Sequence, residues 1–458
     1  MKKTIILATI AVAAISTLTA QTDPTKSDAQ KSAELIERAM EEGEPTVLPD
    51  EAEQSESALS ADIEMTEEPD DSNYSNNCDS LLGAWLKSNT LLMRDNLFGQ
   101  MLEVDSEAAT ASNTPDSVYI QRLAQLGSAI PLVYNEVVRR HIIAYTTTTK
   151  RQTMGLIMGR SLYYFPMIEA ELDAAGLPLE LRMLPVVESS LTPKARSKVG
   201  AQGLWQFMYG TGKLCGLEIT SFIDQRNDPR ASTRAACRFL RSLYNIYGDW
   251  DLALAAYNCG PGNVNKAIRR ADGKRDFWEI YPFLPRETRN YVPAFIAANY
   301  AYAYHSLHDI VPKEAPLTLV TDTIRIERLM HFDQISSTIS CPTEVIRALN
   351  PQFKLDIVPA VKGRSYPLVL PQEVVGSFID AEREIMAKDS TYMSEYIVKS
   401  NSGTKKFVID SKTHVVKKGE NMTAIARKYG VSVKQIVKWN NIKDPSKLRV
   451  GQKLEIFL

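Results

Sequence analysis

The sequence predicts a mainly α-helical domain followed by two small modules, each built from two helices and short strands. Between positions 79 and 308, apolar residues recur at helical intervals. After Pro312, short β-type runs flank helical ones, and the plan of residues 323–371 returns at 413–457, as expected for two copies of one module. With 458 residues and 44% hydrophobic composition, the chain is long enough to bury several cores.

The first 20 residues predict a cleaved secretory signal. Lys2 and Lys3 give a basic start, an apolar run covers Ile5 to Ala14, and Ala20 is a small residue at the expected cleavage site. The alternative, a membrane anchor, needs about 20 apolar residues, and this run is shorter. No cysteine follows the run, so the usual lipoprotein attachment site is missing. We expect an exported protein, periplasmic or associated with the cell wall, with no stable membrane span after cleavage.

Residues 21–75 predict an acidic disordered tether, because they hold 17 acidic residues against 3 basic ones. The whole chain has a net charge of −2. Since the leader carries two positive charges and the tether a net −14, the remaining chain carries about +10. A basic body suits a cell-wall polymer, a membrane surface or a nucleic acid, and charge scattered over a solvated surface explains it equally well.

After a helical pattern that starts at Asp79, five further helices are expected in the main domain. Each has an apolar stripe at helical spacing, and the second begins at a proline, which is favoured in the first turn of a helix. They cover residues 163–175, 178–188, 231–247, 251–257 and 289–305. The aromatic residues of the last one are explained by core packing or by a ligand platform.

The five cysteines are not spaced for metal binding. They form no CxxC pair, so we expect no zinc, and nothing else calls for a metal or a cofactor. Three of them lie in the main domain, where export would permit a disulfide, although small buried side chains fit as well. They are Cys78, Cys215, Cys237, Cys259 and Cys341.

Glu188 is the candidate for acid–base chemistry. It ends an apolar helix and follows Leu184, Val186 and Val187, so its carboxyl group should lose solvation and keep its proton near neutral pH. A neutral carboxylic acid can protonate a leaving oxygen. The serines, amide and tyrosines downstream are hydrogen-bonding groups that suit an uncharged polar substrate such as a sugar polymer.

A second carboxylate, which most glycoside hydrolases need, is not evident. Asp224 and Asp228 lie in a polar loop and fit turn or capping roles. Asp249 and Asp251 flank Trp250 before a helix, and Asp251 is expected to be its N-cap. One acid without a partner indicates that the substrate supplies the nucleophile.

Residues 177–305 resemble the catalytic domain of soluble-type lytic transglycosylases, which cleave peptidoglycan and have a goose-lysozyme-like helical fold. The matching runs are VESS at 187–190, GAQGLWQFM at 200–208, AAYNCGPG at 255–262 and ETRNYVP at 287–293, in the family's order. Together with the C-terminal modules, they resemble the membrane-bound lytic transglycosylase D type. Cys259 and Pro261 depart from many relatives, but they lie in the loop after the motif.

The resemblance implies roles for individual residues. Glu188 matches the single catalytic acid and base, and Tyr291 matches the tyrosine that approaches it from the last helix. The other implied residues bind substrate: the resemblance places a serine near the acetamido and C6 groups of the sugar, two residues in the groove and two in the cleft. These are Ser197, Gln206, Met208, Tyr257 and Asn258.

The implied activity is non-hydrolytic cleavage of the β-1,4 bond between N-acetylmuramic acid and N-acetylglucosamine, which leaves a 1,6-anhydro end. Two alternatives stay open: a hydrolytic muramidase on the same fold and a catalytically silent peptidoglycan-binding scaffold. The expected partner is the glycan strand and not a nucleic acid. The final module resembles LysM, a glycan-binding family, and Gly419 marks its opening turn, whereas the first copy lacks a clear counterpart.

The predicted organisation is a goose-lysozyme-like, mainly α catalytic domain of the α+β lysozyme superfamily, followed by small βααβ LysM modules. The domains are expected at 1–20 (signal peptide), 21–75 (acidic tether), 76–176 (helical region packed on the catalytic lobe), 177–312 (catalytic domain), 323–371 (degenerate LysM-like module), 372–412 (linker) and 413–458 (LysM domain).

Overall fold

A computed structural model describes the chain as two compact units. The described residues are 101, 112–147, 149–313, 320–361, 363–393, 396–399, 405–407, 411–440, 442 and 444–457. The first unit runs to Leu217 and resumes at Pro229, and the second contains Glu218–Asp228 and the chain from Thr318 onward. The predicted signal peptide and acidic tether lie outside the described residues.

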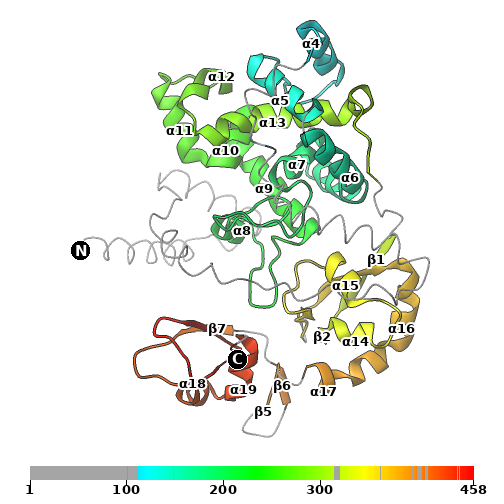
Figure 1. The fold of residues 1–458 in the computed structure, drawn as a ribbon, viewed down its shortest axis with the longest axis vertical. Helices are drawn as coiled ribbons and strands as arrows, with labels where there is room; N and C mark the ends of the chain where they lie inside the picture. Colours follow the sequence, from blue (N-terminus) through cyan, green and yellow to red (C-terminus); the bar gives the residue numbers. More distant parts are fainter. Residues whose placement is uncertain are drawn as a thin grey trace, which may run out of the picture. The chain divides into compact units, whose positions relative to one another are not determined.

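The first unit is helical, as the sequence predicts (Figure 1). Two long helices, α9 and α13, match the expected apolar stripes closely. In chain order the helices are α4 (Asp116–Gln125), α5 (Glu136–Thr147), α6 (Thr149–Ala174), η4 (Leu179–Met183), α7 (Leu184–Ser189), α8 (Tyr209–Leu214), α9 (Pro229–Tyr247), α10 (Trp250–Cys259), α11 (Pro261–Arg270), α12 (Phe277–Ile280), η5 (Tyr281–Phe283), α13 (Arg286–Ala303) and η6 (His305–His308).

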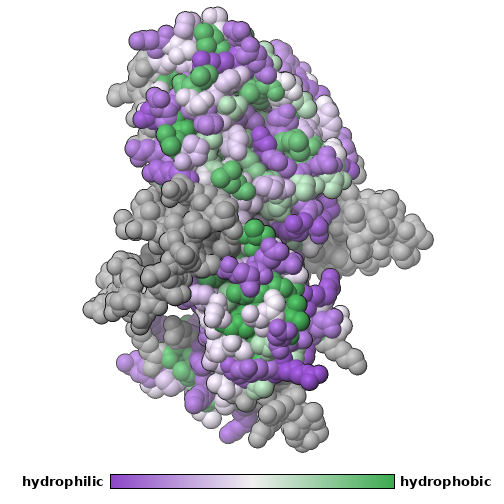
Figure 2. All heavy atoms as spheres, turned by 90° about the vertical axis from the view of Figure 1, so that its right-hand side faces the viewer, coloured by the Kyte–Doolittle hydropathy of each residue, from purple (hydrophilic) through white to green (hydrophobic). Residues whose placement is uncertain are grey.

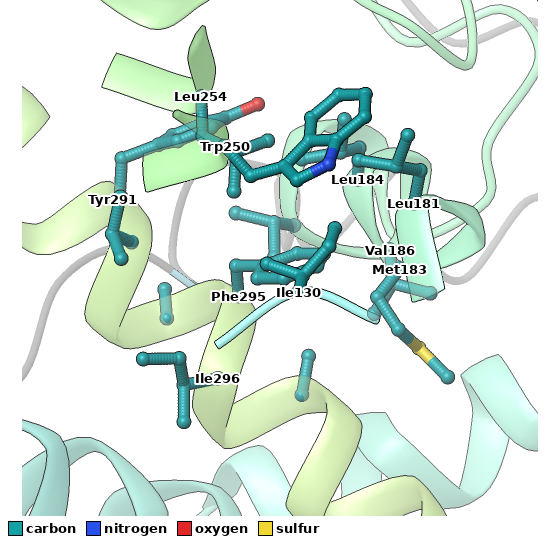
Figure 3. Close-up of a cluster of buried hydrophobic side chains, with 14 of the residues drawn as sticks. Ile130, Leu181, Met183, Leu184, Val186, Trp250, Leu254, Tyr291, Phe295 and Ile296 are labelled. Carbon is teal, nitrogen blue, oxygen red and sulfur yellow. The ribbon is translucent and has the colours of Figure 1, made fainter. Parts of the chain in front are cut away.

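Helix α13 lies at the centre of this unit, where it contacts α5, α7 and α10. The residues Tyr291 to Ala298 are each fully buried, so the helix has no solvent face along this stretch. Figure 3 shows Tyr291 and Phe295 of this helix in the same apolar cluster as Leu181 and Leu184. The aromatic stripe is therefore largely core, and it fixes α7 and α13 against each other.

Two helices differ from the sequence expectation. Helix α6 begins at Thr149 rather than near position 163, because the earlier turns are stabilised by burial of Met154 and Ile157 rather than by local propensity. The predicted helix from position 178 is divided: a 3-10 turn, η4, precedes the six-residue helix α7. The division lets the second piece end at Ser189, directly after Glu188.

The second unit holds the two predicted modules, and each has one antiparallel strand pair that joins its first and last strands (Figure 1). The first module contains β1 (Thr321–Ile326), β2 (Met330–His331), α14 (Phe332–Ser336), α15 (Thr343–Leu349), β3 (Ile357–Val358) and β4 (Tyr366–Pro371). The C-terminal module contains β7 (Ser411–Val415), α18 (Met422–Tyr429), α19 (Val433–Trp439) and β8 (Lys453–Phe457). The predicted βααβ plan is confirmed.

An asparagine after the second helix performs the same task in both modules. Asn350 exchanges two hydrogen bonds with the backbone of Val369, at 2.7 and 2.8 Å. Asn440 does the same with Glu455, at 2.9 and 2.7 Å. In each case the asparagine also donates to the carbonyl four residues earlier. This shared clamp supports the interpretation of the two segments as copies of one module.

The segment expected to be a linker contains regular structure. It includes α16 (Gln372–Ala387), which packs on β1 and β4, then α17 (Asp389–Tyr392), and the paired strands β5 (Ile397–Lys399) and β6 (Lys405–Phe407). Helix α16 forms there because it can bury Phe378 and Ile385 on one face. The segment therefore extends the first module rather than simply connecting two domains.

Residues 218–228 also belong to the second unit, although they interrupt the first in sequence. Phe222 is fully buried with Leu329, Ile357, Met393 and Tyr396. The backbone of this segment bonds that of residues 352–354, and Glu218 pairs with Arg364. The chain thus leaves the helical unit after Leu217, packs into the first module and returns at Pro229.

The four described cysteines carry free thiols, and three of them are buried. Within the described residues, no helix combines the length and the hydrophobicity that crossing a bilayer requires. On the face drawn in Figure 2, hydrophilic residues are interspersed among hydrophobic ones.

Candidate active site

Glu188 occupies the last turn of α7, one residue before the helix ends. It is half-buried, and its neighbours Val186 and Val187 are completely buried. The backbone reverses immediately after it, because Ser190 and Leu191 both adopt the left-handed conformation, with φ of 51° and 56°. The short helix and this turn together fix the position of the carboxyl group.

The Glu188 carboxyl group is bonded to Tyr291. The tyrosine hydroxyl donates to Oε1 of Glu188 over 2.6 Å, from the fully buried centre of α13. Burial raises the pKa of Glu188 to about 7, and the hydrogen bond from Tyr291 opposes this rise because it favours the carboxylate. The group can therefore be neutral or charged near neutral pH. A residue that first donates a proton and then accepts one needs both forms.

A second tyrosine lies in the electrostatic field of Glu188. The hydroxyl of Tyr257, in α10, donates to the carbonyl of Trp205 over 2.7 Å. Burial, together with the charge of Glu188, raises the pKa of Tyr257 and of Tyr291 well above the ordinary value. Both phenols therefore stay neutral and act through hydrogen bonds.

The GAQGLWQF run forms a tight loop that lies against α7. Gly200 and Gly203 have φ of 87° and 90°, which a residue with a side chain rarely adopts. Ser189 donates to the carbonyl of Leu204 over 2.8 Å, which joins the end of α7 to this loop. The buried Trp205 donates from Nε1 to Thr233 over 2.9 Å and thereby holds the loop on α9.

Gln206 is placed differently from Met208, the other predicted groove residue. Its side-chain amide donates to the carbonyls of Ala195 and Gly203, at 3.1 and 2.8 Å, and its own φ is 47°. The nitrogen of this side chain therefore fastens the loop. Met208, by contrast, is 43% exposed and precedes α8. Ser197 is half-buried, and its hydroxyl accepts from the backbone of Ala201 over 3.0 Å.

Asn258 is held by a residue that the motif analysis missed. Thr288, which is fully buried at the start of α13, donates to Oδ1 of Asn258 over 2.7 Å. This bond fixes the amide and directs its nitrogen away from the threonine. A hydroxyl group in the ETRNYVP run was a possible signal, but a sequence does not show which side chain it meets.

Asp224 makes the turn contacts expected of it, whereas the expected N-cap of α10 needs a correction. Asp224 accepts from the backbone and side chain of Arg226, as a turn residue does. The N-cap of α10 is Asp249, which accepts from the amide of Leu252 over 2.8 Å; the expectation that Asp251 is the cap was wrong. Asp251 lies inside the first turn, where burial raises its pKa to about 7.

The structure thus brings Glu188, Tyr257 and Tyr291 together and places Asn258 on the same helix as Tyr257. Gln206 faces its own loop. The pKa of Glu188 is shifted by burial and by Tyr291, and no other described carboxylate contributes to the shift. In the described part of the chain, no group of three or more His, Cys, Asp or Glu side chains is arranged to hold a metal ion.

Three family models match this chain. Residues 165–280 match the Transglycosylase SLT domain, residues 320–387 match the LysM-like domain of the lytic transglycosylase MltD, and residues 414–457 match the LysM domain. The first match covers Glu188, the GLWQF loop and the AAYN segment, and it agrees with the lysozyme-like class that the sequence predicts.

Among curated proteins, the chain is 33% identical over 301 residues to membrane-bound lytic murein transglycosylase D of Escherichia coli strain K12, covering 64% of this chain and 63% of that relative. The chain thus spans less than two thirds of that relative's length. Soluble lytic murein transglycosylase of the same strain is 35% identical over 125 residues, covering 26% of this chain and 19% of that protein.

A solved structure of the 70 kDa soluble lytic transglycosylase of Escherichia coli aligns with a TM-score of 0.29 and 21% identity, covering 53% of this chain and 38% of that one. The domain assignment rests on the family models. Residues 165–280 of this chain match the transglycosylase SLT family, and they are followed by segments that match the MltD LysM-like domain and the LysM domain.

Proposed function

We propose that this protein is a peptidoglycan lytic transglycosylase. It cleaves the β-1,4 bond between N-acetylmuramic acid and N-acetylglucosamine and leaves a 1,6-anhydro end on the muramic acid. The observation that carries this proposal is the environment of Glu188: a carboxyl group with a pKa of about 7 that accepts a hydrogen bond from Tyr291 over 2.6 Å, within the segment that matches the SLT family. The names of two similar curated proteins, both lytic murein transglycosylases, support the same assignment.

In the proposed first step, neutral Glu188 donates its proton to the glycosidic oxygen. The bond from that oxygen to the anomeric carbon of the muramic acid breaks, and positive charge develops at this carbon. Because Tyr291 donates to Oε1, it stabilises the carboxylate that Glu188 becomes. The acetamido oxygen of the same sugar stabilises the cationic carbon, a role that a second protein carboxylate has in most glycosidases.

In the second step, charged Glu188 accepts the proton of the C6 hydroxyl, and that oxygen bonds to the anomeric carbon. One glycosidic bond has then been exchanged for one anhydro bond, and Glu188 is neutral again. No water is consumed and no metal takes part. We expect Asn258 and Met208 to contact the sugar; the bond from Thr288 to Asn258 and the exposure of Met208 support this expectation.

We further propose that the protein acts in the cell envelope, after export by the predicted signal peptide, and that the C-terminal LysM domain binds the glycan. Tethering a binding domain to the catalytic domain raises the local concentration of substrate. The names of the curated relatives and the LysM match support an envelope location.

The substitution Glu188→Gln tests the proposed function. Gln keeps the shape of the side chain but can neither donate an acidic proton nor accept one. Cleavage of purified sacculi should fall by at least about 10³-fold, a conservative figure for removing a group that acts as both acid and base. Binding to sacculi in a sedimentation assay should remain. If Glu188→Gln cleaves at the parent rate, the assignment of the acid is wrong.

A further inference from the structure

The turn that follows Glu188 needs support from elsewhere in the fold. Ser190 and Leu191 are consecutive residues with positive φ, and neither is glycine. Each such residue costs about 1–2 kcal/mol in the left-handed region, and the cost is tolerated only where surrounding structure enforces it. The amides of Ser190 and Leu191 donate to the carbonyls of Val186 and Pro185 and so close the end of α7. The carbonyl oxygens of Ser190 and Leu191 themselves need donors from elsewhere.

Arg160 supplies these donors. Its Nη1 lies 3.3 Å from the carbonyl oxygen of Ser190, 3.2 Å from that of Leu191 and 2.7 Å from Oγ1 of Thr192. Arg160 is 3% exposed, and it projects from α6, 28 positions before Glu188. One guanidinium group thus contacts three successive residues of the turn.

The chemistry of this contact suits a structural clamp. Burial lowers the pKa of Arg160 to about 10, so the side chain is still charged at neutral pH. Hydrogen bonds from a charged donor are about twice as strong as those between neutral groups. Without them, two carbonyl groups in the interior would lose their partners, at a cost of about 1–3 kcal/mol each.

Arg160 acts on Glu188 through the turn that it holds, and it does not shift the pKa of Glu188 directly. The pKa of Glu188 is set by burial and by Tyr291, and Arg160 is not among the groups that shift it. Position 160 also precedes the segment that matches the SLT family, residues 165–280. The clamp therefore comes from the part of α6 that lies upstream of the recognisable catalytic domain.

We propose that Arg160 is a positioning residue for the catalytic acid: its guanidinium holds the left-handed turn at Ser190–Thr192 and thereby fixes Glu188 beneath Tyr291. The catalytic part of this inference rests on the proposed function. It also assigns a task to the helical region before the SLT domain, which completes the active site rather than merely packing against it.

Full-length protein with Arg160→Lys, Arg160→Met or Thr192→Val tests the proposal, with Arg122→Lys as the matched control. Arg122 donates to the hydroxyl of Tyr300 in the same unit, at 2.7 Å, and is outside the proposed site. Two readouts are needed: amide hydrogen exchange of the peptide covering residues 184–195, and the pH dependence of kcat and KM on purified glycan strands.

The expected result is faster exchange at residues 189–192 in all three test variants, with no change there in the control. In Arg160→Met, kcat should fall about 10- to 100-fold, and KM should stay within about twofold of the parent value. The alkaline limb of the pH profile of kcat should move to lower pH, because better solvation lowers the pKa of Glu188. Arg160→Lys should recover part of the loss. Thr192→Val, the mildest change, keeps the folded state accessible if Arg160→Met does not fold.

Unchanged exchange at residues 189–192 in Thr192→Val and Arg160→Lys would overturn the clamp. A loss of kcat that follows the folded fraction, with an unmoved alkaline limb, would overturn the positioning role. If the parent enzyme releases no anhydro product, the proposed function fails, while the exchange measurement still decides whether Arg160 holds the turn.

Discussion

The hydroxyl of Tyr291 lies 2.6 Å from Oε1 of Glu188, although the two residues are 103 positions apart in the chain. Helix α13 is buried on all sides along this stretch and delivers the hydroxyl to the end of α7. Two opposing effects thus act on one carboxyl group: burial favours its neutral form and the tyrosine favours its charged form.

Tyr291→Phe separates these effects. Loss of the hydroxyl removes the group that stabilises the carboxylate, so the pKa of Glu188 should rise above about 7. We expect the alkaline limb of the pH–rate profile to move up by about one pH unit, because a hydrogen bond to a charged group contributes about 1.5–3 kcal/mol. At neutral pH kcat should fall about tenfold, since the step that requires charged Glu188 becomes harder.

Tyr257→Phe is the comparison for this measurement, because the hydroxyl of Tyr257 bonds the Trp205 carbonyl and not Glu188. Its alkaline limb should move less than that of Tyr291→Phe. Equal displacement in both variants, or displacement of the Tyr291→Phe limb to lower pH, would contradict the assigned role of Tyr291.

The raised pKa of Glu188 should also appear in the pH dependence of stability. The native protein keeps this proton up to pH about 7, whereas the unfolded chain releases it near about 4.3. Between these values the native state binds more protons, so the free energy of unfolding falls as pH rises. The full loss from this group is about 4 kcal/mol, because each pKa unit between the two states contributes about 1.4 kcal/mol, and it is complete above pH about 7.

The Glu188→Gln variant has no titrating group at this position, so its free energy of unfolding does not fall in this way as pH rises. Its stability relative to the parent should therefore improve by about 3 kcal/mol between pH 4 and pH 8, as measured by urea unfolding. Asp251 titrates in both proteins and cancels in the difference. A difference that is the same at both pH values would mean that Glu188 has an ordinary pKa.

Thr288→Val tests how Asn258 is oriented. Valine keeps the shape of the buried threonine but cannot donate to Oδ1 of Asn258. The amide is then free to rotate, and KM for glycan strands should rise up to about tenfold, the effect of one hydrogen bond worth about 1.4 kcal/mol. The turnover number should stay near that of the parent. Ser242→Ala, on the exposed face of α9, should change neither value.

Gly155 in α6 is predicted to be irreplaceable for packing. A Cβ atom at this position would lie 2.5 Å from the carbonyl oxygen of Val311, and the backbone nitrogen of Lys313 bonds the Gly155 carbonyl at 2.9 Å. Gly155→Ala should lower the stability of the helical unit by about 1–3 kcal/mol despite the better helix propensity of alanine.

Gly210→Ala in α8 is the matched control, because a Cβ there has no neighbour within 4 Å. Its thermal unfolding midpoint should stay the same or rise slightly. Equal midpoints for the two alanine variants would show that the contact between α6 and the backbone at position 311 is not as close as described.

Local signals explain which elements the sequence predicts well. In the C-terminal module, both ends of α18 are marked in the sequence: Asn421 caps the first turn, and Gly430 adopts φ of 67° at the end. The start of α6 has no such marker. Its first turns contain Gly155 and are stabilised by burial of Met154 and Ile157, which a sequence window does not reveal.

In the candidate site, too, the sequence predicts what local patterns mark and misses what distant contacts determine. The motifs locate Glu188, Tyr257 and Tyr291, because each lies in a run with a recognisable order of residues. The contacts of Arg160 and Thr288 link positions about 30 residues apart, and nothing in a local pattern states which acceptor a buried donor will meet. The motif predicts that Gln206 lies in the groove, but it does not reveal that the amide nitrogen bonds the carbonyl of Gly203 in its own loop.

The products of sacculus digestion in water enriched in ¹⁸O test the central claim most directly. Intramolecular attack by the C6 hydroxyl predicts muropeptides that are one water lighter than the hydrolytic products, with no ¹⁸O at the new end. Reducing ends that carry ¹⁸O would show that water is the nucleophile and would contradict the proposed lytic mechanism.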